Sequence, residues 1–292
     1  MSEPKKEGKM IPLVIDCSPI CYKAFAMMGE DFSYEEEQTG VIFSFLMQVF
    51  KFAFDFNTKE LVFCWDSNHY KRKEIYPEYK ENREETITPF QRKIIKKQML
   101  ELRCRILPQL GFKNSFIEKG YEADDLIAAI VRKNPNQVFV IASDNDLWQL
   151  LDDCVIYKLD KDNSVLTKEM FINEYGVEPL EWVEVKNLAG CGGDNVKGIE
   201  GVGLKKAIQY LKDTLPNGKI KARIKSKESR QIVVRNDALI RLPYIGLKFN
   251  GAIKETICSD IGTWIDVFTD YGFKSFLKKD YFDKLKTIFK LK

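Results

Sequence analysis

Acidic side chains recur in this sequence at the points where apolar runs end. Asp16 closes the run IPLVID, Asp66 follows LVFCW, and Asp144 follows QVFVIAS, with another aspartate two residues later. Three more acids open the amphipathic stretch EADDLIAAIVRK, and a further one lies in a glycine-rich segment. The full set of candidate metal-binding acids is Asp16, Asp66, Glu122, Asp124, Asp125, Asp144, Asp146 and Asp194.

Such a set of acids predicts metal-ion chemistry. Carboxylates that are brought together repel one another, so their pKa values rise unless cations neutralise them. Hard oxygen ligands favour Mg²⁺ or Mn²⁺, and two such ions about 4 Å apart are the usual arrangement for in-line phosphodiester cleavage. One ion would activate water and the other would stabilise the leaving oxygen. For Glu122, Asp124 and Asp125 another interpretation stays open, because acids in the first turn of a helix also complement its dipole.

The rest of the composition narrows the class of protein. The chain of 292 residues contains a single histidine, His69, which argues against paired histidine ligands and serine–histidine dyads. Seven cysteines without a Cys-x-x-Cys pair fit a reducing compartment. The apolar run over residues 41–56 is short for a membrane span and contains Lys51, so we expect a buried helix. We therefore expect a cytoplasmic protein without a membrane partner, in which residues 1–10 form a flexible charged tail.

Strands must position the acids. The apolar runs before Asp16, Asp66 and Asp144, and the segment SFIEKG, have the composition of strands, and helical periodicity lies between them. This alternation predicts an α/β fold with a parallel sheet, and ligands bind at the carboxyl edge of such sheets. The acids are therefore expected to converge on one edge.

Helix signals complete the predicted fold. Serine–proline at 18–19 and threonine–proline at 88–89 each place an N-cap before a proline, so helices should begin there, the second ending near Gly111. A hairpin is expected with its turn at residues 160–163. The C-terminal YFDKLKTIFKLK is expected to be an amphipathic helix that docks on the domain.

The second half of the chain is basic and carries a glycine-rich turn. Gly198, Gly201 and Gly203 precede a helical stretch with Lys205 and Lys206, and backbone N–H groups at such a turn suit phosphate binding. A simple interhelical turn is the alternative. Residues 197–235 contain eleven Lys or Arg residues and three acids, although the net charge of the chain is only +3. A basic flank beside an acidic pocket indicates a polyanion whose reactive phosphate meets metal.

Five ordered motifs resemble those of the 5′ nucleases of the flap endonuclease family: VIDCSPICYKAF, IYPEYKENR, YEADDLIA, SDNDLWQLL and GDNVKGIEGVGLKKA. The likeness covers roughly residues 10–245 and is greatest to the free-standing bacteriophage enzymes and the 5′-nuclease domain of bacterial DNA polymerase I. It implies a PIN-like nuclease domain over residues 11–185, with a helical arch at about 68–105. It also implies a helical DNA-binding region over residues 186–292, with a helix-hairpin-helix at about 190–211.

By position, the resemblance assigns roles to individual residues. The eight acids match the metal ligands of the family, and Lys80 and Arg83 match arch residues that bind the scissile phosphate. Tyr79 lies where an aromatic ring can stack on a base. Tyr22 and Lys23 match a Tyr-Arg pair near the cleavage site, where lysine keeps the charge and loses the planar fork.

The resemblance further implies cofactors and partners. It implies two Mg²⁺ or Mn²⁺ ions, and a K⁺ ion on the backbone carbonyls of the glycine turn. It implies a monomer that acts on branched DNA with 5′ flaps or 5′ ends in replication or repair. Family members cut flaps, degrade DNA 5′ to 3′, and often remove RNA primers from RNA–DNA hybrids.

One position departs from the family pattern. Cys191 stands in CGGDN where the family usually has the first aspartate of Asp-x-x-Asp, which removes a carboxylate from the second metal site. Two alternatives therefore stay open. The chain could be a catalytically weakened protein that binds branched DNA, or a PIN-type ribonuclease that acts on structured RNA.

Overall fold

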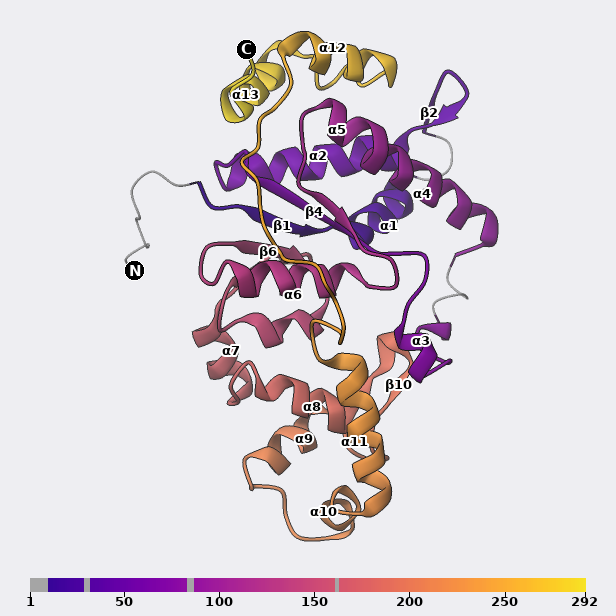
Figure 1. Cartoon of the computed structure of the whole chain (residues 1–292), viewed down its shortest axis with the longest axis vertical. Coiled ribbons are helices and arrows are strands. Elements are labelled where there is room, and N and C mark those ends of the chain that lie inside the picture. Colours follow the sequence, from indigo (N-terminus) through magenta and orange to yellow (C-terminus); the bar gives the residue numbers. More distant parts are fainter. Residues whose placement is uncertain (1–9, 29–31, 83–86, 161–162) are drawn as a thin grey trace.

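A six-stranded sheet forms the centre of the computed structural model, which describes residues 10–28, 32–82, 87–160 and 163–292 (Figure 1). Strands β5, β4, β1, β6 and β7 lie side by side in that order and are parallel, and β8 pairs antiparallel with β7. The strands are β1 (Leu13–Asp16), β4 (Leu61–Trp65), β5 (Ser115–Ile117), β6 (Phe139–Ala142), β7 (Val155–Lys158) and β8 (Val165–Leu166). The predicted strands and the hairpin are confirmed, although two residues of its turn, 161–162, lie outside the described residues.

Helices cover both faces of this sheet because its central strands are apolar on both sides. Leu13 and Ile15 of β1 belong to a core with α1 and α2, whereas Val14 belongs to a second core with α6. All four residues of β1 are buried, as expected for a parallel strand between two helical layers. The predicted buried helix over residues 41–56 is α2. The bounds are α1 (Cys17–Met28), α2 (Gly40–Asp55), α6 (Ala123–Lys133) and α7 (Lys168–Tyr175).

The predicted arch segment lies beside the carboxyl edge of the sheet. It contains α3 (Arg72–Ile75) and α4 (Pro89–Glu101), and residues 83–86 between them lie outside the described part of the chain. Thr88 and Gln91 form a reciprocal capping box at the start of α4, which confirms the predicted helix start.

The helix predicted from residue 89 to Gly111 is continuous but not uniform. After α4, the chain passes through a π-helical turn (Leu102–Ile106) and then α5 (Leu107–Gln109). Pro108 in this region lacks an N–H, so it cannot bond to a carbonyl one turn earlier. Gly111 ends the helix with a φ of 94°, in the left-handed region that favours glycine.

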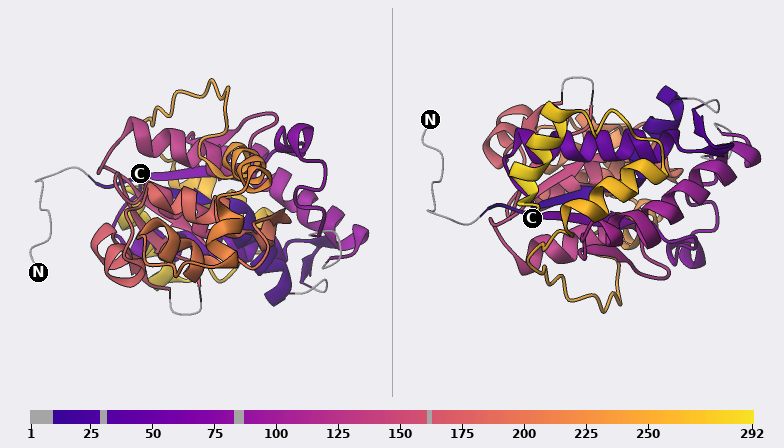
Figure 2. Two further views of the ribbon diagram at one scale, coloured as in Figure 1. Left: turned by 90° about the horizontal axis from the view of Figure 1, so that it is seen from below. Right: turned by 90° about the horizontal axis from the view of Figure 1, so that it is seen from above.

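The chain after residue 180 forms helices at two opposite ends of the molecule. Helix α8 is followed by a short hairpin, β9 and β10, and then by α9, α10 and α11, which form one end in Figure 1. The chain then crosses the molecule in extended form to α12 and α13, and Figure 2 shows these two ends from below and from above. The bounds are α8 (Glu181–Ala189), β9 (Gly190–Cys191), β10 (Val196–Lys197), α9 (Leu204–Leu211), α10 (Lys219–Ile224), α11 (Lys227–Ile240), α12 (Ile261–Asp270) and α13 (Lys279–Phe289).

This arrangement corrects one predicted boundary. Trp264, Phe268, Leu285 and Phe289 are buried in the same core as α2, so α12 and α13 belong to the sheet domain. The prediction that residues 186–292 form a single helical DNA-binding region is therefore wrong for its last part. The predicted docking of the C-terminal helix is confirmed.

Two further features complete the fold. A small hairpin, β2 (Ser33–Tyr34) and β3 (Glu37–Gln38), lies between α1 and α2. In the described ranges, no helix is both long and apolar enough to cross a membrane.

Candidate active site

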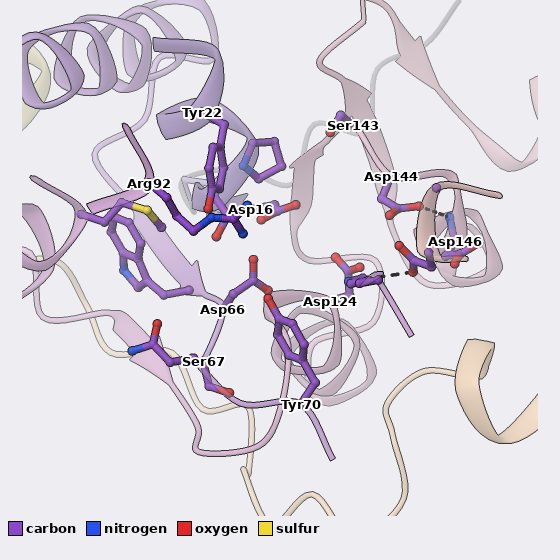
Figure 3. Close-up of a pocket in the computed structure, with 18 of the residues that line it drawn as sticks. Asp16, Tyr22, Asp66, Ser67, Tyr70, Arg92, Asp124, Ser143, Asp144 and Asp146 are labelled. Atoms are coloured by element: carbon purple, nitrogen blue, oxygen red, sulfur yellow. Dashed lines mark hydrogen bonds and ion pairs between the residues drawn. The ribbon is translucent and has the colours of Figure 1, made fainter. Parts of the chain in front are cut away.

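An open cavity of about 1740 Å³ lies at the carboxyl edge of the sheet. Six of the eight predicted acids line it, and Figure 3 shows several of them around one space. They come from the end of β1, from the residues after β4 and β6, from the first turn of α6, and from the segment between β9 and β10. The lining acids are Asp16, Asp66, Asp124, Asp144, Asp146 and Asp194.

Backbone hydrogen bonds fix two of these acids in place. Oδ1 of Asp66 accepts a hydrogen bond of 2.9 Å from the N–H of Ala123, which ties the end of β4 to the start of α6. Oδ1 of Asp144 accepts one of 2.9 Å from the N–H of Asp146 and caps the short 3₁₀ helix there. The acids are therefore held by the same turns that connect strands to helices.

Asp16 is the acid whose buried negative charge is least compensated by hydrogen-bond donors. Its side chain is 5% exposed, and its Oδ1 accepts no hydrogen bond from any of the residues that the structure describes. Burial raises the pKa of Asp16, and the charges of Asp66 and Asp144 raise it further. A buried carboxylate oxygen without a donor suits a cation ligand.

The pKa values of Asp124 and Asp144 are raised for the same reasons as that of Asp16. Burial raises the pKa of Asp124, followed by the charges of Asp144 and Asp16. Burial and the charge of Asp146 raise the pKa of Asp144. Within the described ranges, no three His, Cys, Asp or Glu side chains already converge as a complete coordination shell. The all-oxygen donor set nevertheless fits a hard divalent ion, which would relieve this repulsion.

Glu122 lies behind the cavity wall and contacts protein cations. It is 3% exposed, its Oε1 accepts a hydrogen bond from Lys80, and its Oε2 is 3.0 Å from Nη1 of Arg72. Burial alone would raise its pKa, but Lys80 and Arg72 lower the pKa of Glu122 below its ordinary value. Glu122 is therefore already neutralised by protein side chains, unlike Asp16.

Asp125 faces away from the cavity, and the prediction that it binds metal is wrong in this structure. Its side chain is fully buried, and its two oxygens accept hydrogen bonds of 2.7 and 2.8 Å from the guanidinium of Arg72. It also accepts bonds from the backbone N–H groups of Tyr244 and Glu122. These donors saturate the carboxylate, so Asp125 joins the arch segment, α6 and the chain after α11.

Tyr79 also differs from its prediction. Its ring is 2% exposed, so it cannot stack on a base as predicted. The phenol donates to Oε2 of Glu122 at 2.7 Å and lies 3.0 Å from Oδ2 of Asp194. Tyr79 therefore connects two acids beneath the cavity.

Lys80 reaches the cavity through an unusual backbone conformation. Its φ is 57°, in the left-handed region, and its N–H donates to the carbonyl of Asp194 at 2.9 Å. Its amine contacts Glu122, lies 3.8 Å from Oδ2 of Asp194, and lines the cavity. The structure thus places Lys80 among the acids, and its contact with the scissile phosphate stays a prediction. The predicted partner Arg83 lies outside the described residues.

Tyr22 and Lys23, the pair on α1 that was predicted to lie near the cleavage site, point in different directions. Tyr22 lines the cavity beside Asp16, as Figure 3 shows. Lys23 is exposed and does not line the cavity, so the structure gives its predicted catalytic role no support. The next residue along a helix points about 100° away, which explains the separation.

Two residues of the cavity wall, Arg92 and Lys186, were not predicted from the sequence, whereas the departure at Cys191 was. Arg92 of α4 lies beside Tyr22 in Figure 3. Lys186 of α8 is 6% exposed, and its amine donates to Asp146 and Asn145. Cys191 is buried with its Sγ 3.5 and 3.6 Å from the two oxygens of Asp146. A signal existed for Lys186, because it lies one turn from a tryptophan on an otherwise apolar helix face.

Burial explains the state of the Cys191 thiol. Burial raises the pKa of Cys191 far above its ordinary value, and the charge of Asp146 raises it further. The thiol therefore stays protonated near neutral pH and can donate a weak hydrogen bond to Asp146.

The glycine turn precedes α9 as predicted. Gly198 approaches the backbone of Ala189 so closely that an added Cβ would lie 2.2 Å from its carbonyl carbon, and Gly201 has a φ of 78°. Gly203 is the residue before α9, whose first turn carries the exposed Lys205. The amine of the neighbouring Lys206 donates to the carbonyl of Gly201 at 2.7 Å, so it stabilises the turn.

Comparison with known proteins identifies relatives. Residues 12–176 match the family model described as 5′-3′ exonuclease, N-terminal resolvase-like domain. A 5′-3′ exonuclease from Aquifex aeolicus is 33% identical over 204 residues, which cover 68% of each chain. The thermostable DNA polymerase I of Thermus thermophilus is 28% identical over 215 residues, 72% of this chain and 25% of that one.

A solved structure resembles the whole fold. The bacteriophage T5 flap endonuclease, solved with DNA and metal ions, has a TM-score of 0.62 at 20% identity. The match covers 94% of this chain and 98% of that chain. This likeness confirms the predicted α/β, PIN-like fold class.

Proposed function

This chain belongs to the 5′-3′ exonuclease family, and on that premise we propose that it is a structure-specific nuclease that hydrolyses phosphodiesters at 5′ flaps and 5′ ends. The observation that carries the proposal is Asp16, a buried carboxylate with an unbonded oxygen at a cavity lined by five further acids. Such a group needs a cation, and phosphodiester hydrolysis is the reaction that clustered carboxylates with Mg²⁺ or Mn²⁺ serve.

The residues that would hold divalent ions are the six lining acids, and an ion bound there supplies an activated water and charge stabilisation. Lys80 lies where its amine can leave Glu122 and contact the scissile phosphate. Arg92 and Tyr22 form the wall next to Asp16 and can position the 5′ strand.

The basic end of the molecule supplies the contact to duplex DNA in this proposal. The start of α9 presents backbone N–H groups, and the exposed lysines Lys205, Lys219 and Lys227 lie on α9, α10 and α11 at the same end of the molecule. A K⁺ ion on the carbonyls of the glycine turn is part of the same proposal. In this structure the ammonium of Lys206 donates a hydrogen bond to the carbonyl oxygen of Gly201. A K⁺ ion would therefore have to bind the other carbonyl oxygens of the turn or displace this ammonium.

We also propose that the protein is a monomer, that it acts in the cytoplasm, and that it cleaves RNA in RNA–DNA hybrids. A second candidate, a DNA-binding protein with weakened catalysis, is favoured by one observation, the neutral thiol of Cys191 beside Asp146. A ribonuclease specific for RNA is the third.

One cleavage assay separates these candidates. Matched DNA-flap, RNA-flap and single-stranded RNA substrates would be incubated with the full chain in Mg²⁺ and, as a control, in a chelator. We expect cleavage of the DNA flap near the junction, only with the metal. Binding of the flap without cleavage in Mg²⁺ or Mn²⁺ would favour the weakened binding protein. Preferential cleavage of single-stranded RNA would favour the ribonuclease.

A further inference from the structure

Arg235 of α11 connects the glycine turn to the base of the predicted arch. Its Nη2 donates to the backbone carbonyl of Lys197 at 2.6 Å, and Lys197 is the residue before Gly198 of the turn. The same guanidinium lies over the ring of Tyr76, with its carbon 4.7 Å from the ring centroid. Helix α11 passes α3 and β10 in Figure 1, and it contacts α3. One side chain therefore contacts both segments.

The neighbouring Asn236 holds the guanidinium in this position. Asn236 is fully buried, and its Oδ1 accepts hydrogen bonds of 3.1 Å from Nε and 2.9 Å from Nη2 of Arg235. Its Nδ2 donates to the carbonyl of Lys197 at 3.1 Å and to that of Asn187 on α8 at 2.9 Å. Because a buried amide fixes its donors, Arg235 occupies a defined position and is not a mobile surface charge.

Tyr76 begins the turn that presents Lys80 to the cavity. Its N–H donates to the carbonyl of Arg72 at 2.9 Å, at the end of α3, and its own carbonyl accepts a bond of 3.0 Å from the N–H of Tyr79. Lys80 follows with its left-handed φ of 57°. The turn is short and hydrogen-bonded, so a shift of Tyr76 moves the backbone that carries Lys80.

The loop between β9 and β10 is bonded to the same turn. Nδ2 of Asn195 donates to the carbonyl of Glu78 at 2.8 Å, and Nδ2 of Asn82 donates to the carbonyl of Gly192 at 3.0 Å. This loop and the glycine turn lie at opposite ends of one short hairpin. Arg235 grips the end of that hairpin next to the glycine turn, so both ends are tied to the arch base.

We propose, on the basis of the proposed function, that Arg235 is a positioning residue that couples duplex binding at the glycine turn to the placement of Lys80. Duplex DNA at the start of α9 fixes the glycine turn, and Arg235 fixes Tyr76 relative to that turn. The turn that begins at Tyr76 then holds Lys80 where it contacts the scissile phosphate. Loss of Arg235 should slow cleavage of bound DNA more than it weakens binding, because misplacement of a reacting group lowers the rate strongly.

Single-turnover cleavage of a DNA flap by the full chain at saturating concentration separates rate from affinity. We expect Arg235→Met to lower the saturated rate by roughly tenfold or more, while the dissociation constant changes by less than about threefold. Arg235→Lys should behave like Arg235→Met, because an ammonium keeps the charge but lacks the planar group that bonds to Lys197 while it stacks on Tyr76.

Variants of Tyr76 test the other end of the connection. Tyr76→Leu should lower the rate as Arg235→Met does, whereas Tyr76→Phe should keep the wild-type rate because it keeps the aromatic face. Combining Tyr76→Leu with Arg235→Met should lower the rate no further than either change alone, since both remove the same contact.

Arg241, at the end of the same helix, is the matched control, because its guanidinium bonds to Asp237 one turn earlier. Arg241→Met should leave the rate and the dissociation constant unchanged. Thermal melts identify any variant that fails to fold, and Arg235→Lys keeps the proposal testable if Arg235→Met does not fold. Weaker binding by Arg235→Met at an unchanged rate, a wild-type rate for Arg235→Lys, or additive losses in the double variant would overturn the proposal.

Hydrogen–deuterium exchange with a duplex that carries no flap tests the coupling without cleavage. The duplex should slow exchange at residues 198–203 in the wild type and in Arg235→Met, and at residues 76–80 in the wild type only. Equal slowing at residues 76–80 in both proteins would also overturn the proposal. A wild type that binds the duplex but cleaves no flap would instead contradict the proposed function, and the exchange measurement would still decide the role of Arg235.

Discussion

At the scale of single residues, the acids that suit metal binding lower the free energy of unfolding of the metal-free protein. Burial and neighbouring charges raise the pKa of Asp16, so its ionised form destabilises the folded protein when no cation is bound. Because the folded-state pKa is raised, the folded protein holds more protons than the unfolded chain above the ordinary aspartate pKa. Without metal, the free energy of unfolding should therefore fall as the pH rises through that range.

We expect Asp16→Asn to raise the melting temperature at pH 7.5 in a chelator, because it removes an uncompensated buried charge. In Mg²⁺ the same variant should lose the stabilisation that the wild type gains on binding the ion. Scanning calorimetry in both buffers measures this, with the exposed Asp283→Asn as the control. A wild type that Mg²⁺ does not stabilise would contradict the assignment.

Asp124 tests the separation of metal binding from DNA binding. Asp124→Asn should lower the single-turnover cleavage rate in Mg²⁺ by roughly 100-fold or more, while leaving flap binding in a chelator within about twofold. The reason is that Asp124 faces the other acids and not the basic end of the molecule. Near-normal turnover would rule out Asp124 as a ligand.

Lys80 tests the placement of charge near the reacting phosphate. Lys80→Ala should raise the activation free energy by about 3 kcal/mol, with a smaller effect on affinity, if the amine acts mainly in the transition state. Lys113→Ala, an exposed lysine away from the cavity, is the control. Equal single-turnover rates for Lys80→Ala and the wild type would mean that Lys80 only neutralises Glu122.

At the scale of elements, the local sequence pattern was sufficient to predict the sheet and α2 from apolar runs, the start of α4 from a threonine–proline cap, and the convergence of the acids. It could not predict which acids face the cavity. Glu122, Asp124 and Asp125 share one helical turn, and Asp125 turns inward because it bonds to Arg72 and to the N–H of Tyr244, which are both far away in the sequence. Nor could it predict where α12 and α13 pack, because an amphipathic pattern shows that one face of a helix is buried but does not show which part of the protein that face contacts.

Arg72 should therefore be important for stability. It bonds to Asp125, to Glu122 and to the carbonyl of Leu239, and it is 2% exposed. Arg72→Met should lower the free energy of unfolding by about 3–5 kcal/mol, because it leaves buried carboxylates unpaired. Urea denaturation measures this.

The matched control for Arg72 is Arg105, which is exposed and forms an ion pair with Glu101 one helical turn earlier. Nη1 of Arg105 lies 3.1 Å from Oε1 of Glu101. Arg105→Met should cost less than about 1 kcal/mol. Similar losses for the two variants would show that Arg72 does not join the arch segment to α6 and α11.

At the scale of the whole molecule, the two helical ends differ in composition. Helices α9–α11 carry exposed basic residues and few buried aromatic rings, whereas α12 buries Trp264 and Phe268, and α13 buries Phe289, against Phe50 of α2. The first end is suited to bind a polyanion, and the second completes the hydrophobic core. Substitutions at the two ends should therefore affect different measurements.

We expect Lys205→Ala with Lys227→Ala to weaken flap binding and to reduce the slope of log affinity against log salt by about 1–2, with little change in melting temperature. Phe268→Ala should instead lower the free energy of unfolding by about 3–5 kcal/mol while the folded variant keeps its affinity. Lys284→Ala on α13 removes one charge and should leave the salt slope unchanged, because α13 lies at the end of the molecule opposite α9–α11 (Figure 1). If Lys284→Ala reduced the slope as much per lysine as the pair does, α13 would be part of the DNA-binding surface, and the division of the molecule into two ends would be wrong.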